Sequence, residues 1–473
     1  MHTFSMSVPS THDKAFRINI DAARYGAFAE IGAGQEVARW FFQVGGAAGT
    51  VAKTISAYDM TVSDAVYGPA KRYVSRQRLQ SMLDHEWALL LERLDASRGA
   101  TTQFFVFADT VAAKSFTRKD EGQGWLGIRF QAVRRAPPSE IIIHARMWDT
   151  DNPRQQEALG ILGVNLIHGA FYNHERPDVL IGYLMDGLSR DRMEVDMIKL
   201  SGPAFAGLDN RLMSLQLVEQ RLTNAAVFSP DGEVLEPAEL LYHAPVLMER
   251  GSFRPVTRVT QDMLSQSLAH MRQEPDLKGK EPVVLMEMTI RNLLTLDERV
   301  EHVDFLARMD MLRALGRTVM ISNYSRFHNV TTYLRRYTAE RIGMVVGIPT
   351  LSQILDETHY ADLDGGLLEA LGRLLAGPVR LYVYPWMKGG SGETVTAETF
   401  VVPPRLKHLY RHLLENRFVE SVSAPPDADL SVMHRDDLAL VKAGDSTWEE
   451  MVPPEIVGVI KQRHLFGYGE PPA

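Results

Sequence analysis

The sequence predicts an α/β protein whose C-terminal half is built around a mainly parallel sheet. From about residue 194 onward, short apolar runs alternate with segments of helical periodicity. The runs are nearly continuous in apolar residues, as expected for strands that helices cover on both faces. Successive strand–helix–strand units of this kind form right-handed crossovers. We expect an open three-layer sheet, and the number of runs would also allow a closed barrel.

Residues 1–100 are expected to form a helical N-terminal region rich in small residues. Apolar residues recur at helical spacing within 35–44, and a long helix is expected over 75–98, ending near a glycine. The run 27–31 is a poor strand by its composition. This region therefore predicts helices rather than a sheet.

Residues 101–190 are expected to form a β-rich segment followed by two helices. Three strand-like runs follow one another with Gly-rich and Pro-Pro breaks and no helix between them, a pattern that predicts antiparallel pairing. The runs are 103–107, 125–130 and 140–144, and the helices are 154–173 and 177–189.

Residues 191–418 are expected to form the alternating α/β domain, and residues 419–473 a C-terminal extension rich in Pro and Asp. The helix over 403–416 opens with a Pro-Pro pair, and proline suits a helix start. The expected strands are 195–200, 225–228, 246–248, 283–288, 318–321, 342–346 and 380–384.

The composition argues against several classes of protein. The chain has 473 residues with 45% hydrophobic and 23% charged residues, as in folded globular proteins, and its net charge of −8 disfavours a nucleic-acid binder. It contains no cysteine, which excludes disulfides, thiolate nucleophiles and Cys-ligated metals. No apolar signal core and no run of ~18 apolar residues is present. We expect a cytoplasmic protein with neither a membrane nor a nucleic-acid partner, and no metal site.

The stretch Gly251–Thr257 is the strongest candidate for a binding site. It reads Gly-Ser-Phe-Arg-Pro-Val-Thr and stands between an apolar run and a helix-like segment. A glycine turn at this place directs backbone N–H groups at one spot, where the helix dipole also favours anions. We therefore expect Gly251, Ser252 and Phe253 to contact a phosphate, unless the turn only redirects the chain and Pro255 fixes the helix entry.

Two further segments end expected parallel strands, where ligands of open sheets bind. Ser322, Asn323 and Arg326 follow the strand at 318–321, although Ser322 and Asn323 are also common helix N-caps. Glu287 lies near the end of the apolar run 283–288, where an acid needs a partner or a function.

Gly32-Ala33-Gly34 before a helix has the spacing of part of a dinucleotide-binding fingerprint, with Asp59 as the later acid. Val37 stands where the third glycine would be. Close packing of a helix through small residues is the other explanation, and we favour it.

The stretch Gly251–Thr257 resembles the phosphate-binding signature of nicotinamide and nicotinate mononucleotide adenylyltransferases, in which a Gly-Ser-Phe-x-Pro-x-Thr/His run follows the first strand. The resemblance implies that Arg254 and Thr257 act at the ATP phosphates. Thr260 stands where that family has a phosphate-binding histidine, so Arg254 and Arg258 would have to supply the positive charge. Residues 321–326 resemble, more loosely, a second phosphate-binding stretch of the same family.

Over its full length the chain resembles a poorly characterised family of bacterial proteins of about this size. The resemblance is carried by 30–36, 209–215, 249–257 and 382–385. Members carry the names nicotinate-nucleotide adenylyltransferase and TonB-dependent receptor. The second name fits poorly, because an outer-membrane barrel needs a series of ~10-residue alternating strands.

The leading hypothesis is a cytoplasmic α/β enzyme that binds a nucleotide or another phosphorylated small molecule, with ATP and Mg²⁺ as cofactors, and that transfers an adenylyl group. Two alternatives remain open at this stage. One is a non-catalytic, homo-oligomeric assembly or scaffold protein. The other is a barrel enzyme that uses Lys199 or Glu287 on a carbonyl substrate.

Overall fold

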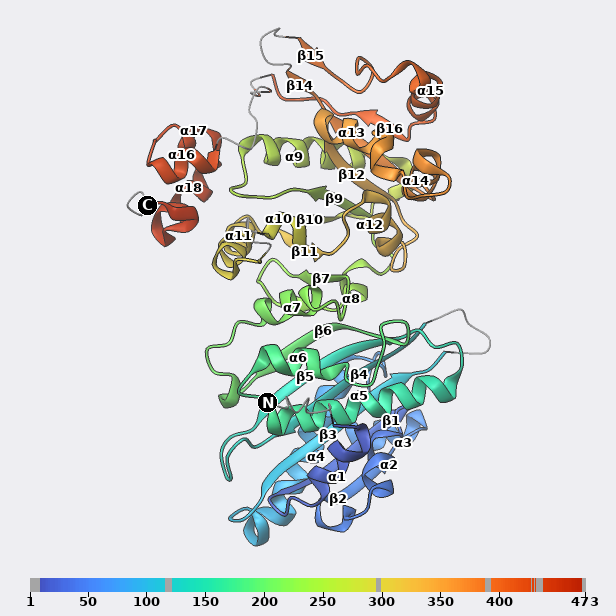
Figure 1. Ribbon diagram of the computed structural model, residues 1–473, viewed down its shortest axis with the longest axis vertical. Helices are drawn as coiled ribbons and strands as arrows, with labels where there is room; N and C mark the ends of the chain where they lie inside the picture. The colour runs from blue at the N-terminus through green and yellow to red at the C-terminus, as the bar shows by residue number, and fades with distance from the viewer. Residues whose placement is uncertain are drawn as a thin grey trace, which may run out of the picture. The chain divides into compact units, whose positions relative to one another are not determined.

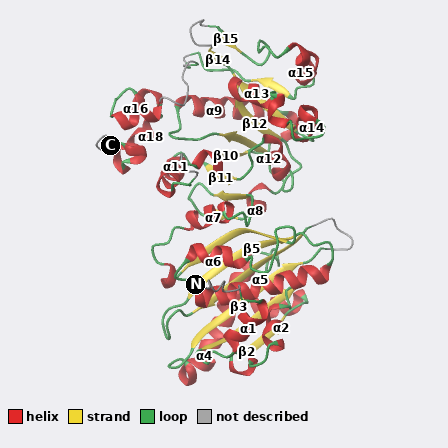
Figure 2. Cartoon of the chain, in the orientation of Figure 1, coloured by secondary structure: helices red, strands yellow, loops and turns green. Residues whose placement is uncertain are grey.

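The computed structural model describes residues 9–114, 121–294, 299–387, 393–426, 428, 430 and 437–469. The chain divides into two compact units, Met1–Asn224 and Ala225–Ala473. Each unit has its own sheet, as the ribbon shows (Figures 1 and 2). Each also has its own apolar core. Part of the predicted extension 419–473 lies outside the described residues.

The first unit contains a six-stranded sheet in the order β2-β1-β3-β4-β5-β6. β1 pairs in parallel with both β2 and β3, whereas the pairs from β3 to β6 are antiparallel. The antiparallel segment predicted for 103–144 is thus confirmed and is extended by one strand. The bounds are β1 (Arg24–Gly32), β2 (Val51–Ser56), β3 (Gln103–Ala112), β4 (Gly122–Phe130), β5 (Ser139–Met147) and β6 (Met193–Ser201).

Helices cover both faces of this sheet. The longest buried one, α5 (Asn152–Tyr172), packs with α1, α2, α6 and α7 over the face that carries Phe28, Phe107 and Ile143. On the other face Leu79 and Leu83 of α4 lie against Gly127. The remaining bounds are α1 (Thr11–Asn19), α2 (Val37–Gln43), α3 (Met60–Tyr67), α4 (Arg76–Arg98), α6 (Pro177–Leu184) and α7 (Asn210–Glu219).

The structure organises the N-terminal half differently from the sequence-based division at residues 100 and 190. The run 27–31 is part of β1, an interior strand that pairs with β2 and β3. Buried phenylalanines of β3 and α2 pack against its Phe28 and hold the strand in the core. The run 195–200 is an antiparallel edge strand of this same sheet rather than the start of the parallel one. Ranges 1–100, 101–190 and 191–224 therefore build one unit.

The second unit contains an eight-stranded sheet in the order β16-β13-β12-β9-β10-β11-β7-β8. The strands from β16 to β11 are parallel, and the hairpin β7–β8 adds an antiparallel edge. The bounds are β7 (Ala225–Phe228), β8 (Val234–Leu235), β9 (Val246–Arg250), β10 (Val283–Thr289), β11 (Thr318–Ser322), β12 (Ile342–Gly347), β13 (Val379–Tyr384) and β16 (Val419–Ser421), with the separate pair β14 (Trp386–Met387) and β15 (Thr394–Val395).

Two groups of helices make this sheet the middle of three layers. α9 and α11 lie on one face, and α18 packs on α11; α8 and α12 to α15 belong to the core of the other face. The bounds are α8 (Pro237–Leu241), α9 (Arg258–Arg272), α10 (Ile290–Leu293), α11 (His302–Ala314), α12 (Phe327–Leu334), α13 (Ile348–Ile354), α14 (Gly366–Leu374), α15 (Lys407–Glu415), α16 (Asp437–Ala443), α17 (Trp448–Met451) and α18 (Pro454–Arg463).

Both large sheets are open, so the predicted α/β class with an open three-layer sheet is confirmed and the barrel alternative is wrong. Lys199 lies on edge strand β6 of the first unit and not at the mouth of a barrel. Among the described residues, every helix is too short or too polar to cross a lipid bilayer.

Candidate functional site

A cavity of about 380 Å³ opens where the strand order of the second unit reverses. The chain runs outward from β9 to β10 and β11 and then returns to the other side of β9 for β12, β13 and β16. Open α/β sheets bind ligands at such a reversal, outside the carboxyl ends of the strands. The lining residues follow the ends of β9, β12 and β13, and the first turns of α9 add Val259, Thr260 and Met263.

The predicted turn forms one wall of this cavity through Gly251, Ser252 and Phe253. The protein uses part of its backbone: Gly251 N–H donates to the Glu287 carbonyl at 3.1 Å, and Asn292 and Arg308 donate to the Gly251 and Ser252 carbonyls at 3.2 and 2.9 Å. Within the described chain, the N–H groups of Ser252 and Phe253 have no intramolecular acceptor. The N–H groups of Ser252 and Phe253 are therefore left to donate to a ligand, whereas that of Gly251 is not.

Three side chains that line the cavity carry buried polar atoms without a hydrogen-bond partner in the described part of the chain. They are Glu249 through Oε2, Tyr384 through its hydroxyl and Trp386 through Nε1. Glu249 is 4% exposed and Tyr384 is 2% exposed. Burial raises the pKa of Glu249 well above its ordinary value and that of Tyr384 to about 12. The Tyr384 hydroxyl is therefore a neutral hydrogen-bond donor near pH 7, and burial favours the protonated form of Glu249.

Glu287 is not a ligand group of this cavity, because the protein saturates it. Arg250 Nε lies 2.5 Å from Glu287 Oε2, Arg250 Nη2 donates to Oε1 at 3.0 Å, and the Ser322 hydroxyl donates to Oε1. Arg250 also donates to the Tyr324 carbonyl at 3.0 Å. This network joins the ends of β9, β10 and β11, so Glu287 and Ser322 hold the strand ends together.

Arg254 and Thr257, predicted as catalytic, do not line the cavity. Arg254 Nε lies 2.6 Å from Asp304 Oδ1 on α11, so its charge is already compensated. Thr257 is fully buried as the N-cap of α9, where its hydroxyl accepts the Thr260 N–H at 3.2 Å. These contacts support folding roles for both residues, and Thr257 is hydrogen-bonded to Thr260, which itself lines the cavity.

Asn323 and Arg326 are also outside the cavity lining. Asn323 is exposed, and the Arg326 guanidinium is paired with Asp362 and lies 5.7 Å from the ring centre of Tyr360. Neither side chain caps α12. The second phosphate-gripping stretch that the sequence suggested is thus not assembled with Gly251–Phe253.

Sequence reasoning missed Glu249, Gly347, Tyr384 and Trp386. Glu249 was the detectable one, because it is an acid at the end of an apolar run directly before the glycine turn. The others come from β12, β13 and β14, which are remote in the sequence, and only the fold brings them to one cavity with the end of β9.

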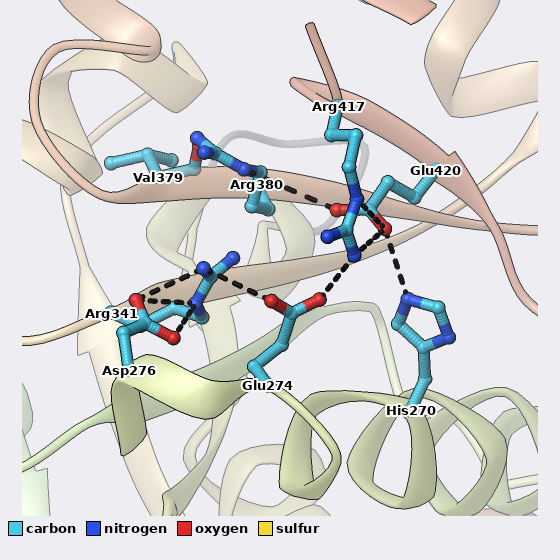
Figure 3. A network of polar contacts seen from close by, with 8 residues as sticks. All are labelled: His270, Glu274, Asp276, Arg341, Val379, Arg380, Arg417 and Glu420. Atoms are coloured by element: carbon cyan, nitrogen blue, oxygen red, sulfur yellow. Dashed lines mark hydrogen bonds and ion pairs between the residues drawn. The ribbon is translucent and has the colours of Figure 1, made fainter. Parts of the chain in front are cut away.

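His270, Glu274 and Glu420 form a cluster near the end of α9 whose spacing would suit a metal ion. The cluster is an ion-pair network (Figure 3). His270 Nε2 lies 3.1 Å from Glu420 Oε2, and Arg417 Nη2 lies 2.7 Å from that same oxygen. Glu274 lies between Arg417 at 2.6 Å and Arg341 at 3.2 Å. Because arginines already neutralise both carboxylates, the cluster ties the end of α9 to β12 and β16.

The Gly32-Ala33-Gly34 turn of the first unit does not present helix N–H groups to a ligand. Glu30 on β1 accepts the N–H groups of Val37 and Ala38 at 2.9 and 3.3 Å and so caps α2 from within the protein. A Cβ on Gly34 would lie 2.0 Å from Asp109 Oδ1. The small residues therefore serve close packing, as the sequence analysis favoured.

No protein-family model and no curated protein matches the chain. Among solved structures, the competence/damage inducible protein CihA of Agrobacterium tumefaciens is 17% identical, with 34% of this chain and 97% of that chain covered and a TM-score of 0.25. A competence-damaged protein (CinA) superfamily member of Enterobacter cloacae is 11% identical, with 36% and 98% covered and a TM-score of 0.27. A competence or damage-inducible protein of Enterobacter asburiae is 12% identical, with 34% and 96% covered and a TM-score of 0.26.

Likenesses of this size say nothing about what the chain binds. The resemblance of Gly251–Thr257 to the adenylyltransferase signature depends on its own residues alone. The chain is an α/β protein with a cavity at the strand reversal of its second unit, and its family is not assigned by these matches.

Proposed function

We propose that the second unit binds a nucleotide or another phosphorylated small molecule in the cavity at the carboxyl ends of β9, β12 and β13. One observation carries the proposal: several hydrogen-bond donors on the cavity wall have no partner among the described residues. These donors are the N–H groups of Ser252 and Phe253, the Tyr384 hydroxyl and Trp386 Nε1, and the buried carboxyl of Glu249 lies on the same wall. Several free donors around one cavity fit a ligand rich in oxygen acceptors.

The electrostatics support an oxyanion bound by dipoles rather than by free cations. Among the described lining residues Arg250 is the one arginine, and Glu287 compensates its charge. The first turn of α9 also lines the cavity, and a helix N-terminus carries the positive end of the helix dipole. A phosphate held this way has its charge offset by Mg²⁺, which ATP brings with it.

The chemistry that fits such a site is adenylyl transfer. A phosphate oxygen of the second nucleotide attacks the α-phosphorus of ATP, the bond to the bridging oxygen breaks, and pyrophosphate leaves with the electron pair. No side chain has to accept a proton, so positioning and charge stabilisation by the donors carry the step. Val259 also lines a neighbouring cleft of about 720 Å³, which offers room for the second nucleotide.

Titration calorimetry with ATP and with nicotinamide and nicotinate mononucleotide, each with Mg²⁺, tests this proposal. The variant Gly347→Phe fills the cavity, because a Cβ there meets only Pro349 and Met263 of the lining, at 3.6 and 3.8 Å. It should abolish binding, while Gly372→Phe on the exposed side of α14 should not. Absence of heat with all three ligands at millimolar concentration overturns the proposal.

A matched pair of tyrosine variants tests the donors directly. Tyr384→Phe removes a cavity hydroxyl, and Tyr382→Phe removes a buried hydroxyl two residues earlier on the same strand and outside the lining. We expect roughly tenfold weaker binding for Tyr384→Phe alone, since a lost hydrogen bond costs about 1 kcal/mol or more. Equal effects of the two substitutions would contradict a direct role.

A further inference from the structure

We propose that Glu249 reads a neutral, N–H-bearing group of the bound nucleotide, such as a carboxamide, and disfavours the carboxylate that could stand in its place. The inference rests on the proposed function and names the chemistry that one wall of the same cavity selects. Glu249 is the single acid among the described lining residues. It is thus the one carboxyl among those residues that can change its protonation when a ligand binds, or repel a negatively charged ligand.

The position of Glu249 in the sheet indicates why its partner has to come from outside the protein. Its register partners are Met286 on β10 and Val345 on β12, so its neighbours across the sheet offer no polar group. Arg317 is the one charge that favours its ionised form, and it is too distant for an ion pair within the described chain. Burying a carboxyl without a partner costs about 1–3 kcal/mol, which an apolar residue would not cost.

Glu287 on the adjacent strand is the natural comparison. Both acids lie near the carboxyl ends of neighbouring parallel strands, and both are at least nine-tenths buried. Glu287 is met by Arg250 and by the Ser322 hydroxyl, whereas Glu249 is met by no side chain of the described residues. The fold therefore supplies partners for a buried acid where the acid is structural, and it leaves Glu249 facing the cavity without one.

The chemistry of a buried carboxyl decides which ligand group fits it. A carboxamide N–H donates to a carboxyl oxygen in either protonation state, and the carboxamide carbonyl also accepts from the carboxyl while it keeps its proton. A ligand carboxylate can be accepted only while Glu249 keeps its proton, since two negative charges at contact in a cavity repel strongly. Above the pKa of Glu249, affinity for the carboxylate should fall about tenfold per pH unit.

Nicotinamide and nicotinate mononucleotide form the probe pair, because they differ only in carboxamide against carboxylate. Calorimetry on the full chain at several values between pH 6 and 9 should give tighter binding of the nicotinamide form, at least tenfold at the alkaline end, with a ratio that rises with pH. Glu249→Gln cannot ionise, so the ratio should become independent of pH. The control Glu281→Gln changes an exposed acid paired with Arg272 and should behave as the parent protein does.

The outcomes separate the two proposals. If the parent protein binds none of the nucleotides, the proposed function fails. If both mononucleotides bind with a ratio that neither pH nor Glu249→Gln alters, this inference fails and the binding site stands. If Glu249→Gln weakens ATP and leaves the mononucleotide ratio unchanged, Glu249 contacts ATP instead, and the inference is likewise overturned.

Discussion

The buried acid pair of the first unit makes its stability depend on pH, and Glu30→Gln should remove much of that dependence. Glu30 and Asp109 stand opposite each other on the parallel strands β1 and β3. Burial raises the pKa of Glu30 to about 7, although the N–H groups of Val37 and Ala38 offset part of the shift. Burial and the charge of Glu30 also raise the pKa of Asp109.

The sign and size of the effect follow from proton linkage. Between 4.5 and about 7, folded Glu30 keeps a proton that the unfolded chain releases, so the free energy of unfolding falls as the pH rises. The stabilisation is complete below the unfolded value and is lost as the pH passes through the folded value. At 1.36 kcal/mol per pKa unit the loss is about 3 kcal/mol in total. Glu30 accepts the N–H groups of Val37 and Ala38 with different oxygens, so glutamine can accept only one of them. That loss is the same at every pH, because glutamine does not titrate.

Urea unfolding followed by tryptophan fluorescence and by circular dichroism measures the effect, at intervals from pH 5 to 8. Two probes are needed because a chain of two units need not unfold in one step. We expect Glu30→Gln to gain roughly 2–3 kcal/mol relative to the parent protein between these limits. The exposed Glu175→Gln should leave the profile unchanged. Parallel profiles for the parent protein and Glu30→Gln would refute the linkage.

Two further substitutions test the structural roles of residues near the two turns. Glu287→Gln should destabilise the second unit by about 3–5 kcal/mol, because it leaves the Arg250 charge buried without compensation. In urea unfolding, its loss of stability should far exceed that of Glu281→Gln, which removes one partner of an exposed ion pair. Gly34→Ala should cost about 1–3 kcal/mol through its collision with the Asp109 carboxyl, whereas Gly372→Ala, in open space within α14, should raise the melting temperature slightly. A Glu287→Gln protein as stable as its parent, or a neutral Gly34→Ala, would contradict these assignments.

The sequence predicted the second unit well because each of its strands is recognisable from a few neighbouring residues. Each parallel strand is a short apolar run between helices, and every run expected from 246–248 to 380–384 is a strand of the sheet. The run 27–31 was misjudged because its two alanines, and Gly26 directly before it, lower the strand propensity. Packing overrides that propensity: a Cβ on Gly26 would meet the Phe105 carbonyl at 2.2 Å, so the small residue is what lets β1 pair.

The candidate site was only partly predictable. Gly251, Ser252 and Phe253 do line the cavity, as their place between a strand and a helix indicated. Arg254 was expected there because of its charge, but the acids that hold it lie on α11, remote in the sequence. Likewise, Glu287 was an oddity in the sequence until Arg250 and Ser322 were placed around it. The sequence does not show which residue compensates a charged side chain. Only the fold decides whether the protein provides that partner or a ligand has to provide it.

By itself, the sequence determined the α/β class, the parallel sheet and the turn that precedes α9, because periodicity and turn chemistry act over a few neighbouring residues. The tertiary structure decided everything that depends on the order of the strands. It placed β12 rather than β11 beside β9, which brought Val345, Gly347 and Tyr384 to the glycine turn and created the cavity. It also left Glu249 without a partner while it surrounded Glu287 with two. Contacts between residues far apart in the chain carry no local pattern, so their outcome is visible only once the sheet is assembled.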